Sequence, residues 1–274
     1  MLDEKAVDTG DIILNCAEGP AGGPPLVLLH GFTGWWRSWQ LLIPQLLPTW
    51  HLYACDLRGH GKSGRAANRY RVIDYVQDSV TLLRQYVSQP AILLGRSFGG
   101  LVTLGAAADV PEHVRALVLL DPSLFTWRAG LDTLPIVQQR MRWVHETVQA
   151  AQSYADVVAR CQALMPEADE IRIQMLATQM YGVAPDAVGM VLHHWDEMLE
   201  AFDLVAVLQQ VTQPTLILRG EPRLGSVIRD EDVEFVHKNL PSAVIINIPN
   251  AGHDLDGEQP EAVLHHIQTF LQSV

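Results

Sequence analysis

The chain has 274 residues, of which 48% are hydrophobic and 18% are charged, so it is not an intrinsically disordered protein and can bury an ample core. Lysine and arginine number 19 against 31 aspartates and glutamates, which gives a formal net charge of −12. This acidic balance argues against binding to nucleic acid or to an anionic membrane surface, and we expect a small-molecule partner.

The N-terminal residues and the cysteines indicate a cytoplasmic protein. No apolar run approaches the roughly 20 residues that cross a bilayer. The N-terminus is acidic, whereas a secretion signal would be basic and then apolar. The three cysteines, Cys16, Cys55 and Cys161, are odd in number and far apart. We interpret them as buried free thiols in a reducing compartment.

Short apolar segments alternate with stretches of helical periodicity over most of the chain, which is typical of a mainly parallel α/β sheet. The predicted strands cover residues 12–16, 25–30, 51–56, 91–94, 116–121, 215–219 and 243–248. The helices predicted between and after them cover residues 72–87, 98–108, 230–239 and 260–272.

The alternation stops between Ser123 and Leu208, where the sequence predicts only helices, over residues 134–151, 154–164, 169–181 and 185–204. A crossover between parallel strands needs only about a dozen residues, so this much longer segment is predicted to be an inserted helical cap. We therefore expect an α/β core made of residues 1–122 and 208–274, and a cap of residues 123–207.

One glycine pattern suggests a nucleotide site and fails on its spacing. Gly59-His60-Gly61-Lys62-Ser63-Gly64 matches G-x-G-x-x-G after a strand, but a dinucleotide site would open a helix directly at this turn. A polar segment follows here instead. A phosphate loop ending at the same lysine and serine would need its first glycine where Asp56 stands. We interpret the pattern as a tight turn.

Two adjacent histidine pairs, His193-His194 and His265-His266, raise the question of a metal site. Neighbours on a helix point about 100° apart, so neither pair offers two ligands on one face. The sequence predicts no metal and no other cofactor.

The strongest chemical signal is Gly95-Arg96-Ser97-Phe98-Gly99-Gly100, which follows an apolar strand and opens a helix of small residues. Strand, G-x-S-x-G and helix together describe a nucleophile elbow, in which a sharp turn lifts the serine hydroxyl above the sheet. Ser97 is therefore the candidate nucleophile.

Two further segments converge on Ser97. His30-Gly31-Phe32 ends an earlier strand, where a backbone N–H for an oxyanion hole is expected, and the second N–H would come from Phe98. His253 follows the last predicted strand on a loop that can reach a serine at the end of the sheet. We predict that His253 is the general base.

With these motifs in order, the sequence resembles proteins of the α/β-hydrolase fold over nearly everything outside the predicted cap. The resemblance rests on His30-Gly31-Phe32, on the turn from Asp56 to Ser63, on Gly95 to Gly100 and on Ala251-Gly252-His253. It implies a Ser-His-acid triad, an oxyanion hole at Phe32 and Phe98, and a purely structural role for the Asp56–Ser63 turn.

The chain departs from the family pattern at the triad acid. The family usually places an aspartate after the strand at 215–219, as G-x-x-D, but Arg223 stands at that position. Some relatives carry the acid after the preceding strand, and Asp121 resembles their arrangement. We predict Asp121 as the acid, with Glu221 as its rival and with Asp230, Asp232 and Asp254 as more remote candidates.

These residues predict a serine hydrolase that cleaves a carboxylic ester or a lactone through an acyl-enzyme. Hydrolysis of a C–C bond, an amide or a carbamate on the same residues is the alternative within enzymes, and a non-catalytic ligand-binding protein is the alternative outside them. The predicted cap holds aromatic side chains that either line a pocket over Ser97 or pack within the cap: Trp127, Trp143, Tyr154, Tyr181 and Trp195.

Overall fold

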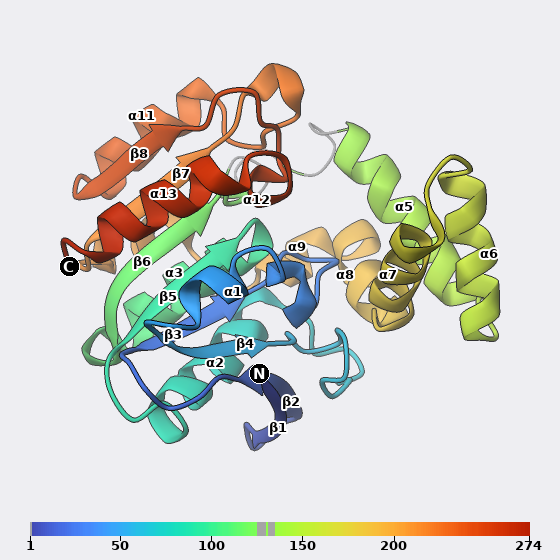
Figure 1. The fold of residues 1–274 in the computed structure, drawn as a ribbon, viewed down its shortest axis with the longest axis horizontal. Coiled ribbons are helices and arrows are strands. Elements are labelled where there is room, and N and C mark those ends of the chain that lie inside the picture. Colours follow the sequence, from blue (N-terminus) through green and yellow to red (C-terminus); the bar gives the residue numbers. More distant parts are fainter. Residues whose placement is uncertain (1, 125–129, 131–134) are drawn as a thin grey trace.

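The centre of the protein is an eight-stranded sheet with the strand order β1-β2-β4-β3-β5-β6-β7-β8 (Figure 1). This computed structural model describes residues 2–124, 130 and 135–274. The strands are β1 (Asp3–Asp8), β2 (Ile13–Glu18), β3 (Pro25–Leu29), β4 (His51–Cys55), β5 (Ala91–Arg96), β6 (Val114–Leu120), β7 (Thr215–Arg219) and β8 (Ala243–Asn247). Strands β3 to β8 are parallel, whereas β1 and β2 pair in antiparallel fashion. The predicted, mostly parallel α/β sheet is confirmed.

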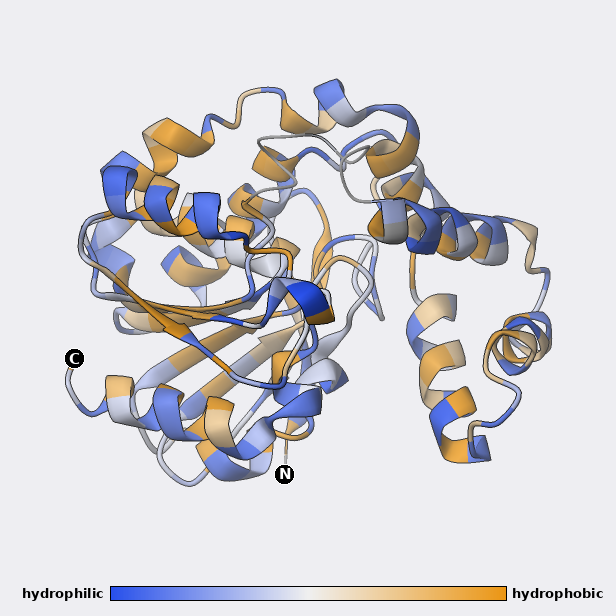
Figure 2. Cartoon of the chain, turned by 90° about the horizontal axis from the view of Figure 1, so that it is seen from above, coloured by the Kyte–Doolittle hydropathy of each residue, from blue (hydrophilic) through white to orange (hydrophobic). Residues whose placement is uncertain are grey.

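Helices cover both faces of the sheet, because successive residues of each buried strand point to opposite sides. In β3, Val27 and Leu29 join the apolar cluster on one face and Leu26 and Leu28 join the cluster on the other. The first face packs against α2 (Val72–Gln85), α3 (Phe98–Asp109), α10 (Leu204–Gln210) and α11 (Asp230–Asn239). The second packs against α1 (Ile43–Leu46) and α13 (Pro260–Leu271). Figure 2 shows the strands as a mostly hydrophobic layer between helices of mixed character.

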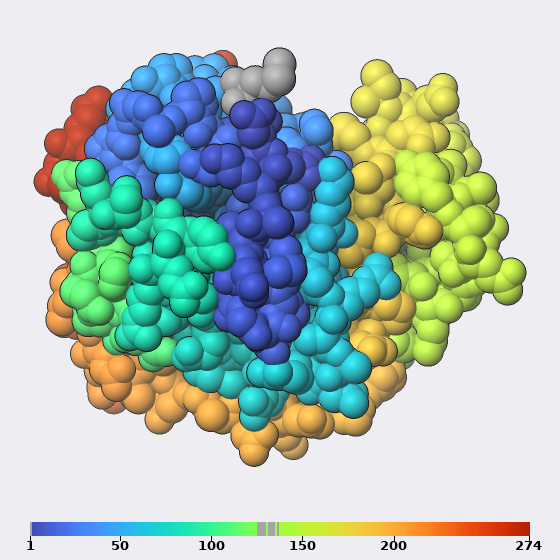
Figure 3. Space-filling model, turned by 90° about the horizontal axis from the view of Figure 1, so that it is seen from below, coloured from blue at the N-terminus to red at the C-terminus, as the bar shows by residue number. Residues whose placement is uncertain are grey.

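Four helices between β6 and β7 form a separate lobe at one side of the sheet (Figures 1 and 3). We call them the cap helices: α5 (Pro135–Ala150), α6 (Tyr154–Leu164), α7 (Glu170–Tyr181) and α8 (Pro185–His193). Within the described residues, none of the helices has the length and apolar composition needed to cross a membrane.

The single helix predicted over 185–204 is wrong, because the structure divides that segment. Helix α8 ends at His193, α9 covers Trp195–Leu199, and α10 begins at Leu204. Ala201 has a positive φ of 64°, which interrupts the helix, and the Asp203 side chain then accepts hydrogen bonds from the first N–H groups of α10. Helix α10 packs on α3 and α11, away from the cap helices.

Strand β1 was not predicted from the sequence. It lies at the edge of the sheet, and of its residues only Val7 is buried. A strand that exposes charged residues on an edge has no apolar alternation to reveal it, although such charges protect the edge from pairing with another chain.

The prediction of three free thiols is also wrong. Cys16 on β2 and Cys55 on β4 face each other in register across antiparallel strands and form a disulfide. The two cysteines are 39 residues apart in the chain, so the sequence pattern did not predict the pairing. Cys161 is buried and free. The cysteines therefore no longer argue for a reducing compartment.

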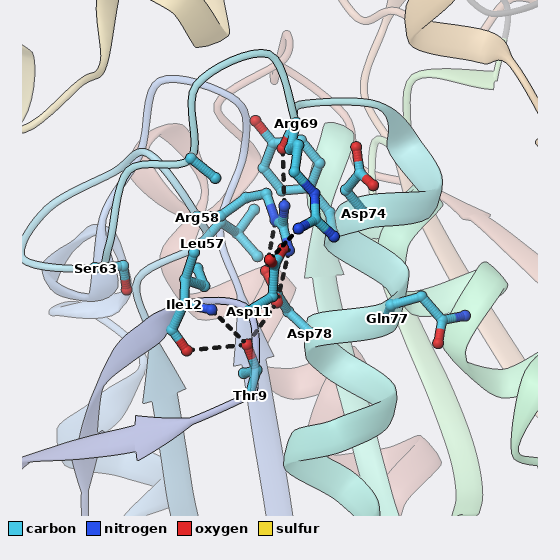
Figure 4. Close-up of polar contacts among 12 residues, drawn as sticks. Thr9, Asp11, Ile12, Leu57, Arg58, Ser63, Arg69, Asp74, Gln77 and Asp78 are labelled. Carbon is cyan, nitrogen blue, oxygen red and sulfur yellow. Dashed lines mark hydrogen bonds and ion pairs between the residues drawn. The ribbon is translucent and has the colours of Figure 1, made fainter.

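The glycine-rich turn after β4 is anchored by a buried ion-pair cluster (Figure 4). Two nitrogens of the Arg58 guanidinium donate to the two carboxylate oxygens of Asp78 on α2, at 2.7 and 2.8 Å. A third contact of 3.0 Å reaches Asp11, between β1 and β2. Helix α2 begins only at Val72, so the turn opens no helix, as a nucleotide-binding loop would. One side chain thus ties β4, α2 and the edge of the sheet together.

The Arg58–Asp78 pair gives a first prediction, on stability. Asp78→Ala leaves the Arg58 charge buried without its bidentate partner and should lower the free energy of unfolding by about 3–5 kcal/mol. Urea unfolding followed by circular dichroism measures this. Lys62→Ala, which removes an exposed ion pair with Glu4, is the control and should cost about 0–1 kcal/mol. Equal losses in the two variants would contradict a central role for the buried pair.

Candidate active site

Ser97 stands at the sharp turn between β5 and α3, at the carboxyl end of the sheet. Its backbone has φ of 51° and ψ of −117°, a strained conformation for a residue with a side chain. The turn is possible because glycines flank it. A side-chain carbon at Gly95 would overlap the backbone of Gly99, and one at Gly99 would overlap the backbone of Leu29. These contacts explain the glycines of the motif.

The structure brings Ser97, His253 and Asp121 together in one hydrogen-bonded chain. His253 Nε2 lies 3.0 Å from Ser97 Oγ, and His253 Nδ1 lies 2.6 Å from Asp121 Oδ2. Because an ionised carboxylate only accepts, Nδ1 carries the proton and Nε2 accepts from the serine hydroxyl. Asp121 is fully buried at the end of β6, and its backbone is also left-handed, with φ of 42°. His253 lies on the loop that follows β8.

The Asp121 carboxylate is fixed by residues of the loop after β7. Ser226 Oγ donates to Asp121 Oδ1 at 2.6 Å, and the Val227 N–H donates to Asp121 Oδ2 at 2.9 Å. These two bonds hold the carboxylate plane in the orientation that presents Oδ2 to the imidazole. Ser226 was not predicted from the sequence, because no motif marks it.

The other acid candidates lie elsewhere. Glu221 accepts the Asn250 N–H at 2.7 Å and an Arg223 N–H at 2.5 Å, and these bonds, the first above all, lower the pKa of its carboxyl. Glu221 therefore braces the loop that carries His253 without touching the imidazole. The remaining three bind other groups: Asp230 pairs with Arg219, Asp232 accepts the Arg229 N–H, and Asp254 pairs with Arg96.

Phe32 and Phe98, the two oxyanion candidates, lie beside Ser97 on the wall of one cavity. Their rings meet edge to face at 5.2 Å. Phe98 is the first residue of α3, at the helix end that favours negative charge. The Phe32 carbonyl contacts the His60 ring, which is fully buried in the glycine-rich turn, and burial lowers the pKa of that imidazole. His60 thereby ties this structural turn to the loop that carries Phe32.

A second hydroxyl, also not predicted from the sequence, lies against the candidate nucleophile. Ser123 Oγ is 2.9 Å from Ser97 Oγ. The single hydroxyl proton of Ser97 is directed to His253, so Ser123 is the donor in this contact. The only signal in the sequence is its position two residues after Asp121, on the same strand end.

A cavity of about 400 Å³ lies over Ser97, between the sheet and the cap helices. Of the aromatic residues expected around it, Trp195 lines it. Tyr154 packs edge to face on Tyr181 and hydrogen-bonds to Gln174 at 2.7 Å, so this pair stabilises the cap. Trp143 packs against the large apolar cluster, and Trp127 lies outside the described residues. The rest of the apolar lining comes mainly from aliphatic and methionine side chains: Leu41, Val137, Met141, Met175, Val191, Met198 and Val227.

Neither histidine pair takes part in a metal site within the part of the chain that the structure describes, where no group of three or more potential ligands comes together. The His193 ring packs against His145 at 5.4 Å, and the His265 and His266 rings lie 5.4 Å apart on α13.

Comparison with known proteins identifies the fold family. The family model described as alpha/beta hydrolase fold matches residues 24–255. The chain is 30% identical to 2-(acetamidomethylene)succinate hydrolase of Mesorhizobium japonicum, over 98% of this chain and 95% of that protein. It is 26% identical to pimeloyl-[acyl-carrier protein] methyl ester esterase of Nitrosomonas europaea, over 86% of this chain and 91% of that protein.

Comparison with solved structures gives the same fold family. A crystal structure of E-2-(acetamidomethylene)succinate hydrolase superimposes with a TM-score of 0.80 at 25% identity, covering 99% of this chain and 100% of that one. The protein belongs to the α/β-hydrolase family, as the motifs suggested. More particularly, it is similar over most of its length to hydrolases that act on different substrates, so the family assignment leaves its own substrate open.

The geometry predicts which carboxylate matters for activity. Asp121→Asn should lower kcat by about 10⁴, because an amide can hold the imidazole in the wrong tautomer and cannot stabilise its positive charge. Glu221→Gln should stay within about tenfold of the wild type, since Glu221 only braces the loop. Steady-state kinetics on an activated ester such as p-nitrophenyl acetate compares them. The reverse ranking would make Glu221 the acid.

Ser123 gives a separate prediction. Ser123→Ala removes a hydrogen bond to Ser97 Oγ and should lower kcat about two- to twelvefold, in line with one lost hydrogen bond of about 0.5–1.5 kcal/mol. Ser123→Thr keeps the hydroxyl and should recover most of the rate. Rates of single-turnover acylation measure the effect directly. An unchanged acylation rate in the alanine variant would show that the contact is incidental.

Proposed function

We propose that the protein is a serine hydrolase that cleaves a carboxylic ester or a lactone through an acyl-enzyme, with Ser97, His253 and Asp121 as its catalytic triad. The observation that carries the proposal is the continuous hydrogen-bonded chain from Asp121 through His253 to Ser97, with contacts of 2.6 and 3.0 Å. The chain ends at a cavity large enough for a small-molecule substrate.

The first half of the reaction makes the acyl-enzyme. His253 Nε2 takes the hydroxyl proton of Ser97 as Oγ attacks the carbonyl carbon, and a tetrahedral oxyanion forms. Asp121 stabilises the imidazolium through Nδ1. The imidazolium then gives its proton to the leaving oxygen, and the C–O bond to the alcohol breaks. In a lactone the alcohol stays attached to the acyl group.

The second half regenerates the enzyme. His253 takes a proton from water, the hydroxide attacks the acyl carbon, and the bond to Ser97 Oγ breaks as the imidazolium returns its proton to the serine. In both halves the negative oxygen would be stabilised by the N–H groups of Phe32 and Phe98, and one such donor is typically worth about 10²–10³ in kcat. No cofactor is required for these steps.

The names of two relatives support cleavage of an acyl bond, and they suggest two candidate bond types, an ester and an amide-type bond. One is an esterase and another is a hydrolase of 2-(acetamidomethylene)succinate. The second name points to an amide-type bond as the alternative, on the same serine and histidine. C–C bond hydrolysis, the other enzymatic alternative raised by the sequence, would use the same serine and histidine. It would need a substrate whose second carbonyl takes up the electron pair of the broken C–C bond before that carbon is protonated.

A non-catalytic ligand-binding role is the alternative outside enzymes. Arg223 in the family's usual acid position was the feature that favoured it. The contact of Asp121 with His253 removes that reason, since the imidazole has a carboxylate partner. Tight binding of a ligand without turnover would support this role.

Labelling with a fluorophosphonate tests the proposal without knowledge of the substrate. The wild type should form an adduct on Ser97, located by peptide mass spectrometry, because its hydroxyl is activated by His253. His253→Ala should slow labelling by several orders of magnitude and lower kcat by about 10⁵–10⁶. His145→Ala, in the cap, is the matched histidine control and should label normally. A folded wild-type protein that fails to react would contradict the proposal.

A panel of substrates distinguishes the bond types. Esters, lactones and amides that share one acyl group should give kcat/KM values that rank the ester or lactone first. If the amide is turned over faster than the matched ester, the amide alternative replaces the ester in the proposal.

A further inference from the structure

The cavity over Ser97 carries an unusual share of positive charge for so acidic a chain. Arg37, Arg96 and Arg140 all line it, while the chain as a whole has a net charge of −12. Two carboxylates, Asp254 and Asp256, are also on its wall. The binding preference of the site depends on how these five charges pair with one another.

Arg96 forms ion pairs with both carboxylates, Asp254 and Asp256. One terminal nitrogen of its guanidinium contacts Asp256, and the other lies 3.3 Å from Asp254. Asp256 is buried, which raises its pKa, while the nearby Arg96 charge opposes that rise. Arg96 also lies over the Trp39 ring, 5.2 Å from its centroid. This cation is held by the protein and is neutralised by two acids.

Arg140 is left without such a partner. It projects from cap helix α5, and among the described residues it forms no ion pair. Its surroundings lower the pKa of the guanidinium, chiefly by burial, while the Asp254 charge acts in the opposite direction. By its accessible surface the residue is exposed, so a ligand that enters the cavity can reach the guanidinium. Arg140 therefore lines the cavity as a solvent-accessible guanidinium that pairs with no carboxylate among the described residues.

Arg37 differs in position. Like Arg140 it is exposed, but its guanidinium lies over the Trp36 ring, 4.4 Å from the centroid. It therefore adds positive potential at the rim, where it favours the approach of an anion. Arg140, in contrast, is engaged by neither an acid nor an aromatic ring among the described residues, so its guanidinium is available to an anion in the cavity.

We propose that the site takes an anionic substrate, whose free carboxylate is bound by Arg140 while its scissile carbonyl is presented to Ser97. The inference rests on the proposed serine hydrolase function and adds the class of substrate. A planar guanidinium matches a carboxylate through two parallel hydrogen bonds. A dianionic phosphate fits less well, because Asp254 and Asp256 stand on the same wall. The apolar lining then covers the carbon chain between the carboxylate and the carbonyl.

A matched pair of esters tests the inference. Mono-p-nitrophenyl glutarate carries a free carboxylate on its acyl group, and the methyl ester of the same compound does not; the corresponding succinates vary the spacing. The wild type should prefer the anionic ester by about tenfold or more in kcat/KM, after subtraction of spontaneous hydrolysis. Arg140→Gln should lower kcat/KM for the anionic ester by about ten- to a hundredfold, mainly through KM, and change the neutral ester by less than about threefold.

Two further variants serve as controls, one for the position of the arginine on α5 and one for its charge. Arg142→Gln removes an exposed arginine of the same helix that does not line this cavity, and should leave both esters unchanged. Arg140→Lys keeps the charge without the bidentate geometry and should retain part of the preference. An added dicarboxylate such as glutarate should inhibit the wild type competitively and the Arg140→Gln variant more weakly.

The outcomes separate this inference from the proposed function. Failure of fluorophosphonate to label Ser97 overturns both. Normal labelling and turnover of neutral esters, without preference for the anionic ester, overturns only the carboxylate site. A preference that survives Arg140→Gln overturns the assignment to Arg140. Loss of the preference in that variant alone supports the inference.

Discussion

The positive φ of Ser97 is the constraint on which the site depends. Such a conformation costs about 1–3 kcal/mol for a residue with a side chain, and persists only where its surroundings hold it. Here the glycines at 95 and 99 allow the backbone of α3 to lie directly against β3 and β5. Asp121 and Asn250 also have positive φ, so strain collects at the carboxyl ends of the strands that carry the reactive groups. The packed sheet below maintains these conformations.

Much of this arrangement could be predicted from the sequence, for a physical reason. Buried parallel strands are continuous apolar runs, so most of the sheet was visible, and β7 was predicted at its observed bounds. In such a sheet the carboxyl ends lie along one edge, which means that polar residues just after separate strands are neighbours in space. The proximity of Ser97, His253 and Asp121 follows from that rule, although the choice of Asp121 over Glu221 required side-chain geometry.

Other features depend on contacts that carry no local signal. The register of β2 against β4 decides that Cys16 meets Cys55, and register was not readable because β1 and β2 are antiparallel additions at the edge. The pairing of charges around the cavity also carries no local signal in the sequence. Arg96 and Arg140 look alike in sequence, and only the fold shows that the first is paired with two carboxylates while the second faces the cavity. Substrate preference therefore resides in the part of the structure that motifs describe least.

The position of the acid shows how neighbouring loops can exchange roles within one fold. Strands β6 and β7 are adjacent and parallel, so their carboxyl ends are two places from which a carboxylate can reach the same imidazole nitrogen. In this chain the carboxylate that contacts the imidazole stands after β6, and the loop after β7 supplies the Ser226 hydroxyl and the Val227 N–H that orient it. Glu221 on that loop holds the Asn250 backbone, and so the segment that carries His253. The loop that lacks the family's usual aspartate thus holds both the Asp121 carboxylate and the segment that carries the imidazole, which explains how Arg223 is compatible with an intact hydrogen-bonded chain.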